Sequence, residues 1–180
     1  KSSDDVGGAS FLELMVGKDP RAGVYQPMGL AASEDGQRVY VADFAWNLLF
    51  VFDRGTGKVR FIGDQDRFPL DRPLDVALDQ DENVYVTDTG SRSVRVYDKN
   101  GKFLRGIGKG DLVKPTGVAI NWQNRRLYVV DTGHNDPRAH QVKIFDLEGK
   151  LLREVGRRGD GDGEFNFPTF ATLDPQGRLY

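Results

Sequence analysis

Three aspartates recur at the same point of a repeated pattern: Asp43, Asp88 and Asp131 each end a short apolar run that contains Tyr-Val. Brought together, three carboxylates could hold a cation, since hard cations prefer oxygen ligands. Aspartate also readily accepts hydrogen bonds from backbone N–H groups just ahead of it in the chain. Because the residue returns in each copy of the pattern, we expect it to cap turns rather than to perform chemistry.

Asp75 departs from the repeated pattern, because the neighbouring copies carry glycine at the same position, as Gly29 and Gly117. A carboxylate there could hold a cation or a substrate amine, or it could simply be solvated. The segment 160–164, Asp-Gly-Asp-Gly-Glu, superficially resembles a calcium loop. A calcium-binding EF-hand needs ligands over about 12 positions between two helices, so we expect an ordinary connection in this segment.

Both histidines, His134 and His140, lie in the segment 132–140, which is longer than its counterpart at 89–93 and therefore reads as an insertion. Two histidines could help to bind zinc, but a catalytic zinc site has about three protein ligands. We therefore expect His134, Arg138 and His140 to be loop residues of a binding surface, without a bound metal.

Phe44 and Trp46 stand where the other copies carry a polar Thr-Gly pair, at residues 89–90 and 132–133. Exposed aromatic side chains on a loop are good anchors for a protein partner. The alternative is that both rings fold down onto a neighbouring part of the structure. With Arg92 from the next copy, these aromatics favour a protein- or peptide-binding site, since no nucleophile–base set or phosphate loop is present in the sequence.

The chain of 180 residues carries 25 basic and 27 acidic side chains. This balance provides no basic surface of the kind that binds nucleic acid, so we expect no nucleic-acid partner. The absence of cysteine excludes disulfides and thiol catalysis. No run of about 18 apolar residues occurs, so no transmembrane helix is predicted.

The candidate residues are positioned by a tandem repeat with a period of about 45 residues. Each copy has a proline before a run of small apolar residues, then an aromatic and β-branched run, an alternating run, and a run that ends in glycine. A period of roughly 40–50 residues built from short strands is typical of propeller blades. We therefore predict an all-β fold, a β-propeller of four-stranded antiparallel blades.

The repeat also predicts how the chain is divided. Residues 1–10 are polar and rich in Gly and Ser, and we interpret them as a leader or linker, whereas residues 11–17 resemble the last strand of a blade. Full blades are expected at about 26–63, 72–108 and 114–156, and a further blade starts at 168–180. Because a blade cut inside its second strand leaves open ladder edges, we expect an incomplete ring, which belongs to a larger propeller or self-associates through these edges.

The repeated pattern resembles that of the NHL repeat family. Residues 115–119, Pro-Thr-Gly-Val-Ala, and residues 128–133, Tyr-Val-Val-Asp-Thr-Gly, are similar to the family's opening and second strand, and residues 159–168 resemble its connection between blades. The resemblance covers about residues 11–180. It implies a propeller that usually has six blades, of which this chain would show about four in whole or in part.

Members of this family serve as protein-interaction platforms, RNA readers and exported sensor domains, and divergent cousins are metal-dependent lyases and lactonases. The fold alone does not choose among these activities. The resemblance favours a non-catalytic, bacterial propeller, periplasmic or extracellular, that binds a protein or peptide and needs no cofactor. The alternative is an enzyme of the lyase or lactonase type with a divalent cation, calcium or zinc, in the central channel near Asp75.

Overall fold

The computed structural model describes residues 23–64, 68–133, 136 and 139–180, and all regular structure within them is β-strand. Twelve strands in this part of the chain form three antiparallel sheets, each made of four consecutive strands. The first sheet contains β1 (Pro27–Ala32), β2 (Arg38–Asp43), β3 (Leu48–Asp53) and β4 (Lys58–Ile62); the second contains β5 (Pro73–Leu78), β6 (Val84–Asp88), β7 (Ser93–Tyr97) and β8 (Phe103–Ile107); the third contains β9 (Pro115–Asn121), β10 (Arg126–Asp131), β11 (Gln141–Asp146) and β12 (Leu151–Val155).

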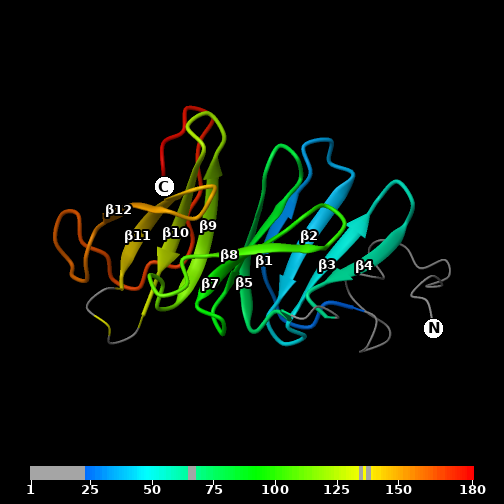
Figure 1. The fold of residues 1–180 in the computed structure, drawn as a ribbon, viewed down its shortest axis with the longest axis horizontal. Coiled ribbons are helices and arrows are strands. Elements are labelled where there is room, and N and C mark those ends of the chain that lie inside the picture. The colour runs from blue at the N-terminus through cyan, green and yellow to red at the C-terminus, as the bar shows by residue number, and fades with distance from the viewer. Residues whose placement is uncertain (1–22, 65–67, 134–135, 137–138) are drawn as a thin grey trace.

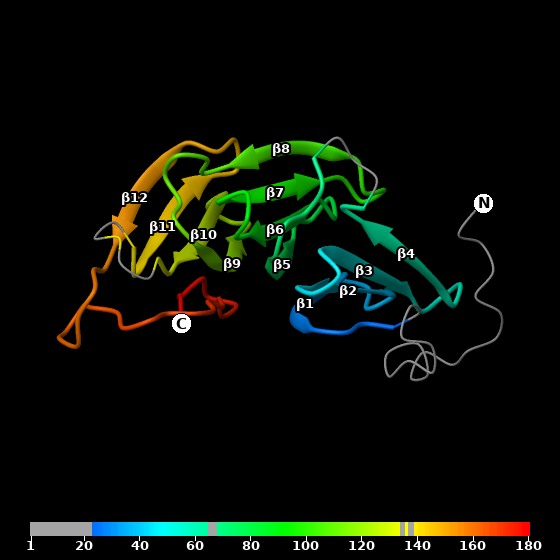
Figure 2. The same cartoon turned by 90° about the horizontal axis from the view of Figure 1, so that it is seen from below.

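The sheets stand side by side as an arc, like part of the ring of a propeller (Figures 1 and 2). The first strands β1, β5 and β9 lie on the concave side of the arc, and the fourth strands β4, β8 and β12 lie on its convex side. The predicted fold class is therefore confirmed, and the three sheets do not close into a ring. The predicted strand at 11–17 lies outside the described residues.

Two opposite faces of the arc are made by different connections. The loop face, at the bottom of Figure 1, consists of residues 23–26, 43–48, 63–64, 68–73, 88–93, 108–115 and 131–133. The turn face, at the top of Figure 1, consists of the hairpins at residues 33–37, 54–57, 79–83, 98–102 and 122–125. Equivalent connections of successive sheets, which start more than 40 residues apart in the chain, therefore lie on the same face.

The hairpins of the turn face are closed by aspartates and glycines. The Oδ1 atom of Asp79 accepts hydrogen bonds from the backbone N–H groups of Asp81 and Asn83, at 2.9 and 2.7 Å. Gly36 and Gly101, with φ angles of 66° and 89°, adopt the left-handed conformation that glycine accommodates without strain. The Asp35-Gly36 and Asn100-Gly101 pairs of the sequence therefore lie in turns.

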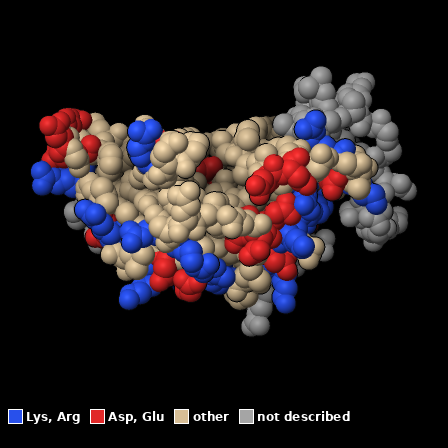
Figure 3. Space-filling model, turned by 90° about the horizontal axis from the view of Figure 1, so that it is seen from above, with Lys and Arg blue, Asp and Glu red and all other residues tan. Residues whose placement is uncertain are grey.

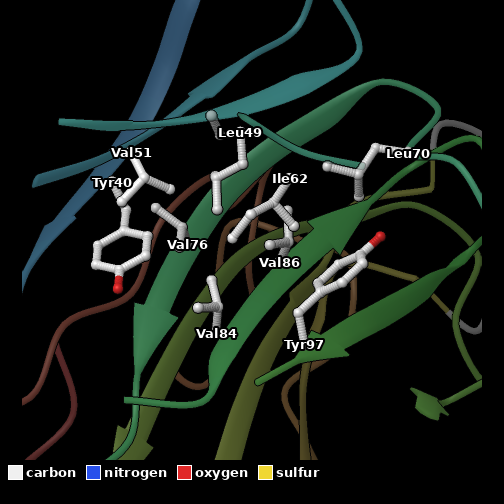
Figure 4. Close-up of a cluster of buried hydrophobic side chains, with 10 residues drawn as sticks. Tyr40, Leu49, Val51, Ile62, Leu70, Val76, Val84, Val86 and Tyr97 are labelled. Atoms are coloured by element: carbon white, nitrogen blue, oxygen red, sulfur yellow. The ribbon is translucent and has the colours of Figure 1, made fainter. Parts of the chain in front are cut away.

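The hydrophobic core lies between neighbouring sheets. The second strands are buried along nearly their whole length, which explains their continuous apolar sequences. Between the first two sheets, Figure 4 shows Tyr40, Leu49, Val51 and Ile62 facing Leu70, Val76, Val84, Val86 and Tyr97. A similar cluster between the second and third sheets contains Tyr85, Val94, Val96, Ile107, Leu127 and Phe145. The tyrosines of the second strands therefore join adjacent sheets.

The inner strands approach one another closely at the concave side. A Cβ atom added to Gly29 would lie 2.7 Å from the Cα atom of Asp75 in β5. A Cβ atom on Gly117 would lie 2.8 Å from the Cα atom of Phe170, in the segment that follows the third sheet. Real Cβ contacts are essentially never this short, so glycine is required at these two positions by the packing of the next inner strand.

Arginines join the sheets on the convex side. Arg60 in β4 donates from Nη2 to the carbonyl oxygen of Lys99 in the second sheet, at 2.5 Å. Arg105 in β8 makes the equivalent bond to the carbonyl oxygen of Leu147 in the third sheet, at 2.6 Å. Hydrogen bonds from charged groups contribute about 1.5–3 kcal/mol each. The repeat therefore encodes the contacts between sheets as well as the sheets themselves.

Residues 168–180 pack against the free face of the third sheet. Ala171 and Leu173 contact the cluster that contains Tyr128, Val130 and Ile144. An isolated antiparallel bridge joins Leu173 to Leu179, and Thr172 and Tyr180 exchange backbone hydrogen bonds of 3.0 and 2.9 Å. This segment therefore begins with the same strand–turn–strand geometry as the sheets before it.

Candidate binding site on the loop face

The repeated aspartates cap the loops, as the sequence predicts. Asp43 accepts four backbone N–H groups: those of Ala45 and Trp46 at Oδ1, both at 3.0 Å, and those of Tyr25 and Gln26 at Oδ2, at 2.5 and 3.0 Å. The carboxylate thus ties the loop after β2 to the segment that enters β1. Its oxygens are occupied by these bonds, so it is not free for chemistry.

Asp88 and Asp131 hold the equivalent loops of the other two sheets. Asp88 accepts the N–H group of Asp71 at 3.0 Å, and Asp131 accepts that of Lys114 at 2.7 Å. Both carboxylates are fully buried, and desolvation raises the pKa of Asp88. Turn capping just ahead in the chain is therefore confirmed for Asp43, and the bonds of Asp88 and Asp131 reach the segment before the first strand of their own sheet. All three carboxylates hold loop backbone rather than form a carboxylate ring.

Two of the three capping aspartates are paired with a buried cation. The Nε atom of Arg95 in β7 lies 3.2 Å from Asp88, and the Nζ atom of Lys143 in β11 lies 3.0 Å from Asp131. In the first sheet, Phe50 stands at the register position that Lys143 has in the third. The loop region of the first sheet is therefore held by backbone donors and apolar packing, without an internal ion pair at Asp43 among the described residues.

Three aromatic residues gather at this region, and we call Tyr25, Phe44 and Trp46 the aromatic patch. Tyr25 and Trp46 are 75% and 39% exposed, whereas Phe44 is half-buried. The N–H group of Phe44 donates to the carbonyl oxygen of Gln26 at 3.0 Å, which places the two loop segments side by side. Of the two expected anchors, Trp46 is thus exposed and Phe44 is half-buried. Tyr25 was not anticipated from the sequence, because it precedes the first recognisable strand.

Two arginines flank the aromatic patch. The N–H group of Arg72 donates to Oδ1 of Asn47 at 2.7 Å, and Thr89 donates from N and Oγ1 to the carbonyl oxygen of Arg72, at 3.2 and 3.0 Å. These bonds connect the loop of Trp46 to the loop of Arg92, and both arginine side chains are exposed. Arg92 is therefore on the loop face, as expected, whereas Arg72 is an addition that only the structure reveals.

His140 does not lie on the surface, contrary to the expectation for the loop 132–140. Its side chain is fully buried, its ring packs 4.7 Å from that of Phe167, and its Nδ1 atom lies 3.3 Å from the N atom of Phe167. Burial removes His140 from the set of residues that a partner could contact. The two other predicted loop residues, His134 and Arg138, lie outside the described residues.

Asp75 is also not the solvated channel group that the sequence suggested. Its side chain is buried, with Oδ1 accepting the N–H group of Val76 at 2.9 Å and Oδ2 accepting that of Val118 in β9 at 2.9 Å. Desolvation raises the pKa of Asp75 to about 6, although these two hydrogen bonds act to lower it. Asp75 thus joins two inner strands and does not present a free carboxylate.

The acidic segment 160–164 closes on itself. Glu164 accepts the N–H group of Gly161 at 3.0 Å and the Nε–H group of Arg157 at 2.7 Å, while Asp160 accepts a hydrogen bond from Asn166 at 2.9 Å. Within the described ranges, no three His, Cys, Asp or Glu side chains are grouped so that they could hold a metal ion.

The turn face differs in character from the loop face. Figure 3 looks onto the turn face and shows acidic side chains gathered on it. A groove of about 550 Å³ between the first two sheets is lined by Glu34, Asp35, Asp79, Asp81 and Glu82, among others. The groove is open and polar, and Glu82 is paired with Arg38 at 2.6 Å. Exposed aromatic anchors therefore distinguish the loop face of the first sheet from this surface.

No helix is present in the described ranges, and so none that is long and apolar enough to cross a membrane.

The comparisons with known proteins agree with the repeat. Residues 70–97 match the family model of the NHL repeat. NHL repeat-containing protein 2 of Gallus gallus is 30% identical over 175 residues, which cover 73% of this chain and 22% of that protein.

The human E3 ubiquitin-protein ligase NHLRC1 is 33% identical over 129 residues, which cover 71% of this chain and 32% of that protein. The chain thus spans about a fifth to a third of the length of these two relatives.

Two solved structures share the fold. A nidogen–laminin complex contains a chain that matches with a TM-score of 0.68 and 22% identity, over 82% of this chain and 52% of that one. Virginiamycin B lyase from Staphylococcus aureus matches with a TM-score of 0.64 and 17% identity, over 86% of this chain and 47% of that one. At these identities the likeness concerns the fold alone. Together with the repeat and the matched family model, the relatives show that this chain belongs to the NHL-repeat β-propeller proteins.

Proposed function

We propose that this chain binds a protein or peptide partner through the aromatic patch on its loop face. The observation that carries the proposal is the exposure of Tyr25 and Trp46 on backbone that Asp43 holds with four hydrogen bonds. Aromatic anchors dominate the energy of many interfaces, and a preordered backbone reduces the entropy lost on binding. The names of one relative, a ubiquitin ligase, and of one structural neighbour, a protein complex, are consistent with this proposal.

The alternative function, a metal-dependent lyase or lactonase, placed a divalent cation in the central channel near Asp75. The carboxylate of Asp75 accepts two backbone N–H groups and is buried between β5 and β9. The resemblance to a lyase is one of fold. No observation on the described residues favours this second function, so we do not propose it.

The proposal is tested with peptides selected on the immobilised protein from a display library of random linear sequences. Replacement of Trp46 by alanine is expected to raise the dissociation constants of the selected peptides by about 30-fold or more, because a hot-spot aromatic residue contributes about 2 kcal/mol or more to binding. The dissociation constants are measured by fluorescence anisotropy.

The matched control is Leu104→Ala, which removes a side chain of similar exposure, 41%, from β8 on the convex side. This variant should bind the selected peptides within about twofold of the original protein, since it lies away from the aromatic patch. Equal affinities of the Trp46→Ala and Leu104→Ala variants, or failure to select any peptide, would count against the proposed site.

A further inference from the structure

We propose that the loop face selects partners that carry acidic side chains beside an apolar one, and that Arg72 and Arg92 read the acidic groups. This inference rests on the proposed protein-binding function and adds the chemistry of the partner. It follows from the position, the backbone conformation and the pairing of the two arginines.

The two arginines form one surface with the aromatic patch. The backbone of Arg72 is bonded on one side to Asn47, next to Trp46, and on the other side to Thr89, three residues before Arg92. A bound peptide that covers Trp46 therefore passes within reach of long, flexible arginine side chains. Asp71 is the exposed acidic residue next to Arg72 and packs its side chain against Gly90.

Both arginines have a left-handed backbone, with φ angles of 60° for Arg72 and 52° for Arg92. Glycine and asparagine adopt this conformation most readily, and Asn47 fills the position in the first sheet that Arg92 fills in the second. Backbone strain at a residue other than glycine supports a use for its side chain.

Pairing within the chain does not account for these arginines. Arg92 forms no ion pair or side-chain hydrogen bond with the residues that the structure describes, and Arg72 meets Asp71 only through Nε, at 3.3 Å. On the turn face, by contrast, Arg125 also has a left-handed backbone but is paired with Glu148 at 2.8 Å. The loop-face arginines thus keep guanidinium N–H groups for a ligand, and the planar guanidinium matches a carboxylate in a two-bond geometry.

The charge balance favours a carboxylate over a cation. Arg72 and Arg92 contribute two positive charges to this surface. Asp71, which contacts Arg72, contributes one negative charge. The nearby Asp88 is buried and already paired with Arg95. Exposed positive charge beside an exposed tryptophan is complementary to a peptide that alternates acidic and apolar residues.

The test uses three fluorescein-labelled peptides with one design: a central Phe-Leu pair flanked on both sides by two glutamates, two glutamines or two lysines. Their dissociation constants are measured by fluorescence anisotropy at about 50 mM and about 300 mM NaCl, since screening weakens exposed ion pairs. We expect the glutamate peptide to bind at least about tenfold tighter than the glutamine peptide at low salt, and the lysine peptide to bind weakest.

The double variant Arg72→Gln/Arg92→Gln should lose this preference, so that the glutamate and glutamine peptides bind with equal affinity. The matched control is Arg54→Gln/Arg125→Gln, which removes two exposed arginines from the turn face and should retain the preference. Circular dichroism of each variant shows whether its sheets are intact.

Equal binding of the glutamate and glutamine peptides, a preference that survives in the Arg72→Gln/Arg92→Gln variant, or no binding of any of the three peptides would overturn the inference. Such a failure is distinguishable from failure of the proposed function. Peptides from the random library that depend on Trp46 but show no acidic preference would uphold the binding site and reject only the role of the arginines.

Discussion

Replacing Lys143 by methionine is expected to lower the free energy of unfolding by about 3–5 kcal/mol, the range found when one partner of a buried ion pair is removed. Lys143 is only 1% exposed, and its Nζ atom contacts Asp131 at 3.0 Å and the carbonyl oxygen of Asp111 at 2.5 Å. Methionine fills a similar volume, so the loss reports on the charge rather than on a cavity.

The cost arises because Asp131 would remain as a buried, uncompensated carboxylate. Among the described residues, the N–H groups of Val113 and Lys114 are the backbone donors that would still stabilise it, whereas Asp43, which has no cation partner in the described ranges, accepts four N–H groups. Because Asp131 ties the loop before β9 to β10, the same substitution should also loosen the entry into the third sheet.

Urea-induced unfolding followed by circular dichroism measures this loss. Lys150→Met, at an exposed site in the same sheet, is the control and should change the unfolding free energy by no more than about 0.5 kcal/mol. A loss below about 1 kcal/mol for Lys143→Met would show that the ion pair is not needed to keep Asp131 buried.

The second large effect is on the pH dependence of stability, and it concerns Asp75. Burial raises its pKa in the folded protein to about 6, from 3.8 for a solvated aspartate, so the folded protein binds a proton more tightly than the unfolded chain does. Between about pH 4 and pH 6 the stability contributed by this group therefore falls as pH rises, and above pH 6 it stays constant. A shift of about two units corresponds to about 3 kcal/mol.

Asp75→Asn removes this titration and keeps one oxygen that can accept a backbone N–H group. From pH 4 to pH 7, the unfolding free energy of the variant should rise relative to that of the original protein by about 3 kcal/mol. The comparison isolates Asp75, because all other carboxylates titrate in both proteins. If the unfolding free energies of the two proteins changed equally between pH 4 and pH 7, the raised pKa of Asp75 would be contradicted.

Features that repeat along the chain could be predicted from the sequence. The repeated Tyr-Val-Xaa-Asp runs predicted the second strands. The recurrence of Asp43, Asp88 and Asp131 predicted a structural role in the loops; the hydrogen bonds confirm turn capping at Asp43 and show that Asp88 and Asp131 hold the segment before their own sheet. Each copy of the repeat forms the same kind of sheet and packs against its neighbours. At these positions the local sequence preference therefore agrees with the overall fold.

Features that differ between copies were harder to predict. The sequence shows that Asp75 replaces a glycine, but the N–H group that its Oδ2 atom binds belongs to Val118, 43 residues away. His140 is likewise packed against Phe167, which lies in the connection after the third sheet. Both contacts are between sheets, and the pattern within one copy carries no information about them.

The residues of the proposed binding surface could be recognised in part from the sequence. Phe44, Trp46 and Arg92 were recognisable because they break the polar pattern of the loops, whereas Tyr25 and Arg72 occupy connections with no fixed pattern. Asp43 accepts the N–H group of Tyr25 and holds it at the aromatic patch, and Asn47 accepts that of Arg72 and holds it beside the patch. The sequence does show one sign of this aromatic residue: Tyr25 lies two positions before Pro27, where the first strand begins.

The claim that a partner covers Trp46 is tested most directly by tryptophan fluorescence. The chain has two tryptophans, and the variant Trp122→Phe leaves Trp46 as the single emitter. Titration with a peptide selected on the original protein should shift the emission of Trp46 to shorter wavelengths, because its exposed ring moves from water into an apolar contact. The shift should saturate with the dissociation constant measured by anisotropy. Saturated binding with an unchanged emission spectrum would show that the partner binds elsewhere and would contradict the account.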